Sequence, residues 1–551
     1  MELERTDVGG RVPWGALSVV VAAWALLRFL FGAGLSASDP LEYVELARRI
    51  ADGSFTLEAH HYSTRFAVTA PVALLIRCFG VTEPAVLAWP LLCSLGTLLL
   101  LFVLGRRHGG ACVGLLAAAL WAVLPLDIAE STNLLPDPIL AFFCTLAVVA
   151  YERGMGEFDV RRARPWLLLA GVAIWGAYSA KIAGALIAPL LAIHAATLGR
   201  RGLRLAWTAT GTLFLLVPEL AWYQHAAGDW LLPLHGIAEV HEKSVGVAAA
   251  NKDLAYRLLK EYANETLRPN EHFGLLGAPL LLAAAATVRD FGRLRLLFLW
   301  GGGLFAYFNF GSSSLDRFVA IPANTRYLHP VVVPGLLLAA LAIVRMVDAT
   351  RTWRYGRALR VLVATGALAL LGSTVASAYV HSGRSYVHLT FREGVAAAAS
   401  LRARPAAVVC SDPRTAQVLR FAFGPTPPFA LLPLKTVGAS ELPATLAPGV
   451  TALVNWREVC KLGDNRMLER DLRESWLAWV ARTEDPERTR LERIQEPTAS
   501  AHRRLAKLPW IWPAVRRDDR VEYFQAKARP HGIWRVEAAA VQSVVREGSV
   551  E

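Results

Sequence analysis

Charged residues and cysteines are both scarce in this sequence of 551 residues. Asp, Glu, Lys and Arg make up only 19% of it, whereas 54% is hydrophobic and the mean hydropathy is +0.37. This balance excludes an ordinary soluble domain. Of the cysteines, Cys410 and Cys460 alone lie away from the apolar segments, and they would pair only in an oxidising compartment. The absence of an internal repeat excludes a solenoid.

Long apolar runs recur through the first 380 positions. They are roughly 17–22 residues long, the length that crosses the hydrocarbon core of a bilayer as a helix. Because helices satisfy their own backbone groups in lipid, the runs predict an all-α polytopic membrane bundle of about eleven transmembrane helices. Residues 66–79 are apolar over only ~14 positions, which favours an interfacial or re-entrant element. The expected spans are residues 14–35, 85–104, 111–126, 138–151, 166–180, 183–198, 205–223, 273–288, 295–311, 330–344 and 360–380.

The net charge of +13 reflects membrane topology rather than nucleic-acid binding. A nucleic-acid site would gather its basic residues on one soluble face. Here every second short loop is basic, as the positive-inside rule expects of cytoplasmic loops, so the N-terminus is expected in the cytoplasm. The outer segments are then residues 36–84, 127–137, 224–272, 312–329 and the chain from 381 onward. The basic loops begin at Arg106, Arg153, Arg200, Arg289 and Arg345.

The composition changes near residue 380, after which the chain is polar and no segment is long enough to cross a bilayer. Apolar stretches indicate alternating strands and helices. We therefore divide the chain into a transmembrane domain, residues 1–380, and an extracytoplasmic soluble α/β domain, residues 381–551, in which no catalytic motif is found. The expected strands are residues 406–410, 451–455, 520–526 and 533–541, and the expected helices are 415–423 and 467–483.

Several ionisable residues lie in or beside the apolar runs, where charge is costly and commonly functional. Asp137 stands between two prolines at the mouth of a span. Asp39 follows the first span and opens an amphipathic helix in the outer loop 36–84. Because Asp is a favoured helix cap, a structural role and a functional role both remain open for Asp39. Arg28, inside the first span, either pairs with an acid or contacts a lipid phosphate, and Asp127 is expected to be structural.

Five motifs follow one another between Ser38 and Pro334, and each contributes residues to the expected outer face. Together they resemble the GT-C superfamily of membrane glycosyltransferases. The closest group uses polyprenyl- or dolichyl-phosphate sugars and contains the protein O-mannosyltransferases and the lipid A aminoarabinose transferase. The motifs are Asp39-x-x-x-Tyr43-x-x-x-Ala47, Arg65 with Pro71, Glu130 with Leu135-Pro136-Asp137-Pro138-Ile139-Leu140, Ser179-Ala180-Lys181-Ile182-Ala183-Gly184 with Pro189, and Arg326-Tyr327-Leu328-His329-Pro330 with Pro334.

The resemblance implies transfer of a sugar from a lipid phosphate to an acceptor hydroxyl at the outer face of the membrane. A carboxylate can deprotonate the acceptor, and the resemblance makes Asp39 the first choice for this base. Asp137 is the second acid, and Glu130 is a weaker alternative in the same loop as Asp137.

Cations are needed to stabilise the departing phosphate. Lys181 and Arg326 are the favoured phosphate ligands, with Arg65 behind them. For Lys181 the competing interpretation is snorkelling to the interface, and for Arg326 it is an ordinary loop charge. Tyr43 and Tyr327 are candidate substrate contacts.

A divalent cation is a possible cofactor, but its ligands are poorly indicated. The aminoarabinose transferase has a Glu-Lys-Pro-Pro stretch where this chain has Ser63-Thr64-Arg65-Phe66, which lacks the acid and the adjacent prolines. His60 and His61 could join Asp39 or Asp137 around an ion, but two adjacent histidines without further spaced ligands are a poor metal signal. Exposed loop histidines are the favoured interpretation.

The sequence thus predicts an integral membrane glycosyltransferase, mannosyltransferase-like, in a bacterial inner membrane. Its partners would be a polyprenyl-phosphate-linked sugar donor and an acceptor protein, glycan or lipid, with no nucleic acid. Two alternatives belong to other classes: a multi-span transporter and a non-catalytic membrane scaffold. Transporters tend to place ionisable groups near the midplane in two related halves, whereas here the acids gather at one edge.

Overall fold

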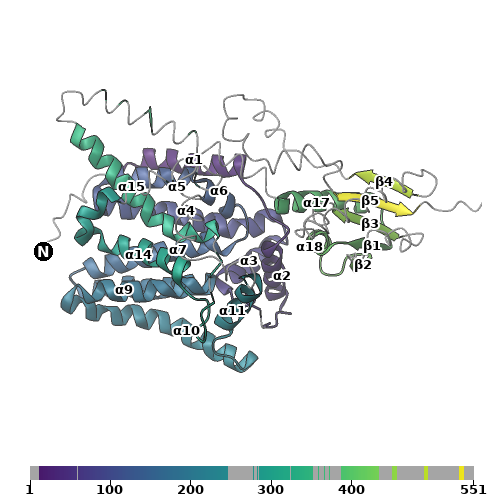
Figure 1. Cartoon of the computed structure of the whole chain (residues 1–551), viewed down its shortest axis with the longest axis horizontal. Helices are drawn as coiled ribbons and strands as arrows, with labels where there is room; N and C mark the ends of the chain where they lie inside the picture. The colour runs from purple at the N-terminus through teal and green to yellow at the C-terminus, as the bar shows by residue number, and fades with distance from the viewer. Residues whose placement is uncertain are drawn as a thin grey trace, which may run out of the picture. The chain divides into compact units, whose positions relative to one another are not determined.

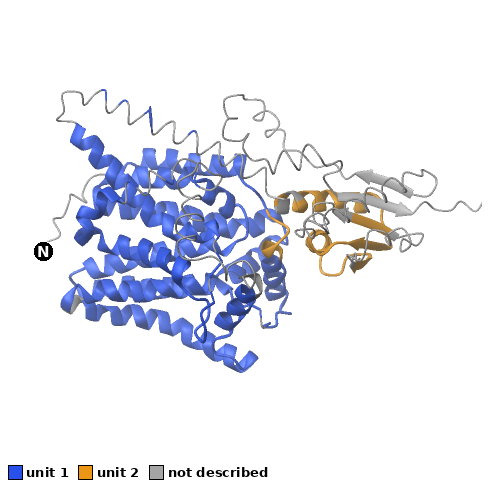
Figure 2. Cartoon of the chain, viewed as in Figure 1, with its two compact units in different colours: residues 1–34, 42–383 blue, residues 35–41, 384–551 orange. Residues whose placement is uncertain are grey.

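The computed structural model describes residues 12–58, 60–245, 285–319, 321–322, 324–350, 386–433, 450–455, 489–493 and 533–538, with isolated positions between 273 and 372. The chain divides into two compact units (Figure 2). The first comprises Met1–Gly34 and Glu42–Gly383, and the second comprises Leu35–Leu41 and Arg384–Glu551.

The first unit is a bundle of helices (Figure 1). Helix α7 has the largest buried share among the helices long and apolar enough to span a membrane, and it packs against α4, α8 and α15. The elements are α1 (Trp14–Phe31), α2 (Asp39–Asp52, which begins in the second unit), α3 (Phe66–Phe79), α4 (Glu83–Gly109), α5 (Ala111–Val123), α6 (Pro125–Ser131), α7 (Pro136–Gly156), α8 (Val160–Ala180), η1 (Ile182–Leu186), α9 (Ile187–Ala196), η2 (Gly199–Arg204), α10 (Leu205–Ala227), α11 (Leu232–Val245), η4 (Val288–Asp290), α14 (Phe291–Phe310), η5 (Thr325–Leu328) and α15 (His329–Ala349).

Local sequence explains where these helices begin and how closely they pack. The side chain of Thr82 caps α4 by accepting from the backbone N–H of Ala85, and Gly110 ends the helix with a φ of +86° that favours glycine. Gly105 and Gly114 allow α4 and α5 to approach closely, since a Cβ atom at Gly105 would lie 2.7 Å from the Cα of Gly114. Small residues serve this purpose in many membrane helix pairs.

Fewer helices meet the criteria for a membrane span than the eleven expected. In the described part of the chain, five helices are long and apolar enough, namely α1, α4, α7, α15 with η5, and α10 with part of η2. A sixth span exists if α5 and α6, bent by 61°, are counted as one. Helices α8 and α14 have 21 and 20 residues but carry arginines, and α9 is short. Most of the expected spans 273–288 and 360–380 lies outside the described residues, so the count of eleven stays a prediction.

Helix α3 coincides with the short apolar run at residues 66–79. Its 14 residues would extend ~21 Å at 1.5 Å per residue, which is less than a hydrocarbon core of about 30 Å. Helix α2 buries Leu41, Val44, Leu46 and Ala47 on one face, which is the amphipathic pattern predicted for the outer loop.

The second unit contains strands and helices. Its five-stranded sheet has the order β2-β1-β3-β5-β4, in which β1 is parallel to β2 and β3, and β5 is antiparallel to β3 and β4. Asp412 caps α18, and a cluster that includes Ala397, Val409 and Leu419 forms the described core. The expected helix 467–483, the expected strand 520–526 and Cys460 lie outside the described residues. The elements are α17 (Tyr386–Ala403), β1 (Val408–Ser411), α18 (Pro413–Phe423), β2 (Ala430–Pro433), β3 (Val450–Asn455), β4 (Thr489–Arg493) and β5 (Ile533–Ala538).

A buried ion pair ties α1 to α6. Arg28 donates to the Asp127 carboxylate, to the Ser131 hydroxyl at 3.1 Å and to two backbone carbonyls. Asp127 also accepts from Ser94 Oγ at 2.5 Å, and its Oδ1 lies 3.0 Å from Nε2 of His329. Of the two roles open to Arg28, the structure shows the pairing with an acid.

Removing one partner of this pair should destabilise the bundle strongly. We expect Asp127→Ala to lower the free energy of unfolding by about 3–5 kcal/mol, because it leaves the Arg28 charge buried without its counterion. The double variant Arg28→Met, Asp127→Leu should recover most of this loss. Thermal unfolding of the detergent-solubilised protein measures both effects. If the single variant is as stable as the wild type, the Arg28–Asp127 ion pair does not stabilise the bundle.

Candidate functional site

Asp137 lies at the start of α7 and accepts from a buried lysine. Leu135 is extended and Pro136 forms the first turn, so the carboxylate enters the bundle at the positive end of the helix. Its side chain has no exposed surface, and its Oδ1 lies 2.8 Å from Lys181 Nζ. Its Oδ2 is 3.9 Å from Nε of Arg326. One buried carboxylate therefore stands between two cations.

Breaks in the secondary structure bring these cations to Asp137. Lys181 is an extended residue between α8 and η1, and only 9% of it is exposed. Arg326 belongs to the short turn η5, which begins where the Asn324 side chain accepts from the backbone N–H of Arg326 at 3.2 Å. The ammonium of Lys181 lies 3.4 Å from the ring centre of Tyr327, a cation–π contact. Tyr327 thereby covers the same cation that Asp137 binds.

Glu130 and His329 lie near this cluster. Glu130 is buried in α6, its Oε2 has no hydrogen-bond partner among the described residues, and the charges of Arg326, Asp137, His329 and Lys181 act on it. His329 is fully buried and is held by Asp127. Sequence reasoning gave no role to His329, although it belongs to the same motif as Arg326.

Arg65 immediately precedes α3 and connects the cations to the outer loop. Its guanidinium donates to the Tyr43 hydroxyl and lies 5.8 Å and 5.9 Å from the ring centres of Tyr43 and Tyr62. Its charge acts on Lys181 and on Tyr327. Tyr43 is fully buried and is hydrogen-bonded to Arg65, and its contact with a substrate stays a prediction.

Asp39 is the first residue of α2, followed by Pro40. It belongs to the second unit, whereas Asp137, Lys181 and Arg326 belong to the first. The hydroxyl of Ser38 donates to its Oδ1 at 3.3 Å. The expectation that Asp39 and Asp137 share the outer face therefore stays a prediction.

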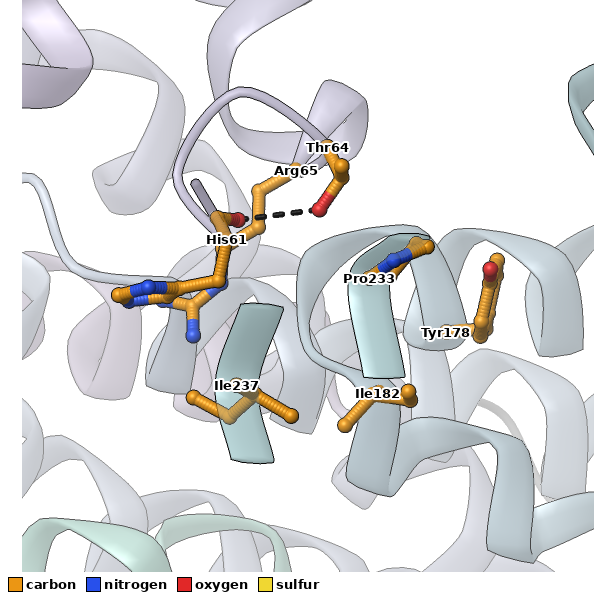
Figure 3. Close-up of a pocket in the computed structure, with 7 residues that line it drawn as sticks. All are labelled: His61, Thr64, Arg65, Tyr178, Ile182, Pro233 and Ile237. Carbon is orange, nitrogen blue, oxygen red and sulfur yellow. Dashed lines mark hydrogen bonds between the residues drawn. The ribbon is translucent and has the colours of Figure 1, made fainter. Parts of the chain in front are cut away.

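A small pocket with a volume of about 20 Å³ lies next to Arg65 (Figure 3). Figure 3 shows His61, Thr64 and Arg65 extending from one turn, with the Thr64 hydroxyl donating to the backbone carbonyl of His61 at 3.0 Å. Residues of α8, η1 and α11 form the other walls. The lining residues are His61, Thr64, Arg65, Tyr178, Ile182, Pro233 and Ile237.

His61 is not the exposed loop histidine that we predicted, since only 7% of it is accessible. Residues 60–65 fold into a tight turn in which Ser63 N–H donates to the backbone carbonyl of His60 at 3.0 Å, and this turn buries the His61 ring while His60 remains exposed. His241 on α11 is similarly buried. Sequence reasoning missed His241, because one histidine on an amphipathic helix gives no distinguishing signal.

The histidines do not form a metal site with the other described residues. Throughout that part of the chain, no three His, Cys, Asp or Glu side chains are arranged to hold a metal ion. Thr64, rather than an acid, precedes Arg65 on the wall of the pocket. Within the described part of the first unit, His60 and His61 therefore lack the further ligands that a metal site requires.

Comparisons with known proteins agree with this architecture. Residues 76–226 match the family model described as dolichyl-phosphate-mannose-protein mannosyltransferase. The crystal structure of ArnT from Cupriavidus metallidurans in the apo state has a TM-score of 0.52 at 14% identity, over 82% of this chain and 95% of that one. The same protein bound to undecaprenyl phosphate has a TM-score of 0.50, with the same identity and coverage.

An archaeal enzyme shares the fold as well. The Archaeoglobus fulgidus oligosaccharyltransferase in complex with Zn and sulfate has a TM-score of 0.53 at 14% identity, over 84% of this chain and 70% of that one. No curated protein matches the chain. The resemblance to the GT-C superfamily that the motifs predicted is therefore confirmed at the level of the fold. The segment that matches the mannosyltransferase family includes Glu130, Asp137 and Lys181.

Proposed function

We propose that this chain is an integral membrane glycosyltransferase that moves a sugar from a polyprenyl-phosphate-linked donor to an acceptor hydroxyl. The observation that carries the proposal is the buried cluster in which Asp137 stands between Lys181 and Arg326. The likeness to ArnT, which has been crystallised with undecaprenyl phosphate, supports a lipid phosphate as the anionic ligand.

The charge balance of the cluster favours an anion. Lys181, Arg326 and Arg65 are three cations, and among the described residues the carboxyls of Asp137 and Glu130 act on this cluster. For these five groups, with both carboxyls ionised, the difference of three and two leaves one positive charge. Buried cations act strongly on a ligand because little water screens them. A bound phosphate would neutralise this remaining positive charge.

The proposed chemistry combines these cations with Asp39, the base that the resemblance of the motifs assigns. Lys181 and Arg326 bind the phosphate oxygens, while Asp137 holds both cations in place. Asp39 accepts the proton of the acceptor hydroxyl, whose oxygen then bonds to the anomeric carbon. The bond from that carbon to the phosphate oxygen breaks, and its electron pair stays on the phosphate, where the cations stabilise the new charge. Attack from the opposite side inverts the anomeric centre.

The alternation of basic loops supports an active site on the outer face and a cytoplasmic N-terminus. The membrane is proposed to be a bacterial inner membrane. The acceptor is proposed to be a protein, glycan or lipid carrying a free hydroxyl. The domain from residue 381 onward would then face the same compartment as the acceptor.

Donor turnover by the purified protein tests the proposal. In lipid nanodiscs, the protein should slowly release undecaprenyl phosphate from a panel of undecaprenyl-phosphate hexoses and pentoses, because water can replace the acceptor. Lys181→Met should reduce the release by about a hundredfold, the range for a group that stabilises developing charge. Arg77→Met, an exposed position on α3, is the matched control and should leave the release unchanged. A transporter or a scaffold would release no lipid phosphate from any donor.

A further inference from the structure

Two buried histidines lie beside the proposed phosphate cations and have no role in the mechanism above. His61 is 7% exposed and His241 is 8% exposed. The Nδ1 atom of each lacks a hydrogen-bond partner among the described residues. A buried polar atom without a partner is costly and requires an explanation, of which a bound ion is one. Both histidines belong to the first unit, as do Arg65 and Lys181.

Packing between α11 and the turn before α3 brings these histidines to the same region. A Cβ atom at Gly236 would lie 3.2 Å from the backbone nitrogen of His61, so α11 lies directly against the turn. Ile237 lines the pocket, and His241 follows it by four positions, which places both on one face of the helix. His241 therefore faces the side of α11 that carries the pocket wall.

The surroundings keep both histidines neutral at neutral pH. Burial lowers the pKa of His61 far below its usual value, and the positive charges of Arg65 and Lys181 lower it further. Burial also lowers the pKa of His241 to about 4, with added repulsion from Lys181 and Arg65. No carboxylate opposes these effects among the groups that act on either histidine in the described part of the chain.

The acidic residues near His241 on α11 are directed elsewhere. Glu242 forms an ion pair with Arg317, and Glu239 is exposed. At the start of the helix, Asp229 binds His235 at 2.8 Å. An anion bound beside Arg65 would thus supply the negative charge that is missing from the surroundings of both histidines.

We propose that His61 and His241 form the part of the phosphate site that distinguishes the phosphomonoester product from the phosphodiester donor. This rests on the proposed function. The donor diester carries one negative charge, and cleavage of its bond to the sugar leaves a second charge on the phosphate. The proton of the acceptor goes to the base, so the phosphate gains no proton from it. Each histidine is able to take a proton from water and donate it in a hydrogen bond to the new dianion.

The consequence is coupling between product formation and proton uptake. A bound dianion favours the charged imidazole and raises its pKa, whereas the monoanionic donor does so less. The site therefore binds the phosphate more tightly as the second negative charge develops on it. This tighter binding stabilises the leaving group. The proton returns to water when the lipid phosphate leaves the site.

The binding of two lipids that differ by one negative charge tests the proposed role of the histidines. Undecaprenyl phosphate and undecaprenyl methyl phosphate are titrated at pH 7.5 into the full chain in nanodiscs, in two buffers of different ionisation enthalpy. The wild type should prefer the monoester by about tenfold and take up protons as the monoester binds. His61→Asn and His241→Asn keep a donor near the Nδ1 position but cannot be protonated. Each should reduce the preference to about threefold and reduce the proton uptake, with diester binding unchanged.

The matched control is His235→Asn on the same helix, which should retain the wild-type preference. Thermal unfolding of each variant shows whether the fold is kept. If the two histidine variants weaken both lipids equally, or retain the wild-type proton uptake, the histidines are structural and the assignment is wrong. If the wild type binds neither lipid, the proposed function itself fails.

Discussion

Replacing Asp137 with asparagine should reduce sugar transfer by at least about a hundredfold while leaving the affinity for the donor intact or higher. Asparagine removes the negative charge that fixes Lys181 at 2.8 Å and attracts Arg326. The site then becomes more positive, so an anionic donor still binds. Turnover falls because the cations are no longer held where charge develops on the leaving phosphate. Steady-state kinetics should therefore show a lower kcat without a higher KM.

A double variant tests whether Asp137 and Lys181 act together. Asp137 and Lys181 form one unit, so the double variant Asp137→Asn, Lys181→Met should be no worse than the poorer single variant. Asp159→Asn is the matched control, because Asp159 is an exposed cap of α8 and asparagine caps a helix equally well. If the Asp137→Asn variant has the wild-type kcat, Asp137 is not part of the active site. Strictly additive losses in the double variant would show that Asp137 and Lys181 act independently.

Replacing Asp39 with asparagine should reduce transfer by about 10²- to 10⁴-fold, the contribution of a general base. Asparagine has the same shape as aspartate, so α2 should still begin at the same residue. Binding of undecaprenyl phosphate should be unchanged, because the phosphate ligands are retained. This combination of lost transfer and retained lipid binding separates the base from Lys181, whose loss should weaken both.

Asp52→Asn is the matched control for Asp39, since it changes an exposed acid at the other end of the same helix. It should retain the wild-type rate. If Asp39→Asn keeps more than about a tenth of the wild-type rate, the loss is smaller than a general base contributes, and Asp39 has only a structural role.

Local sequence was sufficient for the positions of many elements. The amphipathic face of α2, the short helix α3 and the strand β3 were all indicated by the period and length of apolar residues. These features depend on neighbours a few positions apart, which the chain fixes directly. The number of spans was less accessible, because α8 and α14 carry arginines within helices of 21 and 20 residues. Hydropathy alone does not separate a long span from an adjoining turn of helix that lies outside the membrane.

The site was predicted only in part. The motifs pointed to Asp137, Lys181, Arg326 and Arg65, and the structure brings the first three into direct contact or near contact. The burial of His61 was missed, because it depends on the packing of Gly236 from a distant helix against the turn before α3. The partner of Arg28 was left open for the same reason, since Asp127 and Ser94 come from other helices.

The sequence by itself determined that the chain is a helical membrane protein with acids and cations at the ends of its apolar runs, because hydrophobicity and charge act locally on each segment. Only the tertiary structure decided which of those charges meet. Lys181 and Arg326 reach Asp137 because breaks before η1 and at η5 turn them inward against α7. Such contacts depend on the packing of distant helices, where the geometry of one interface fixes which side chains share a buried space.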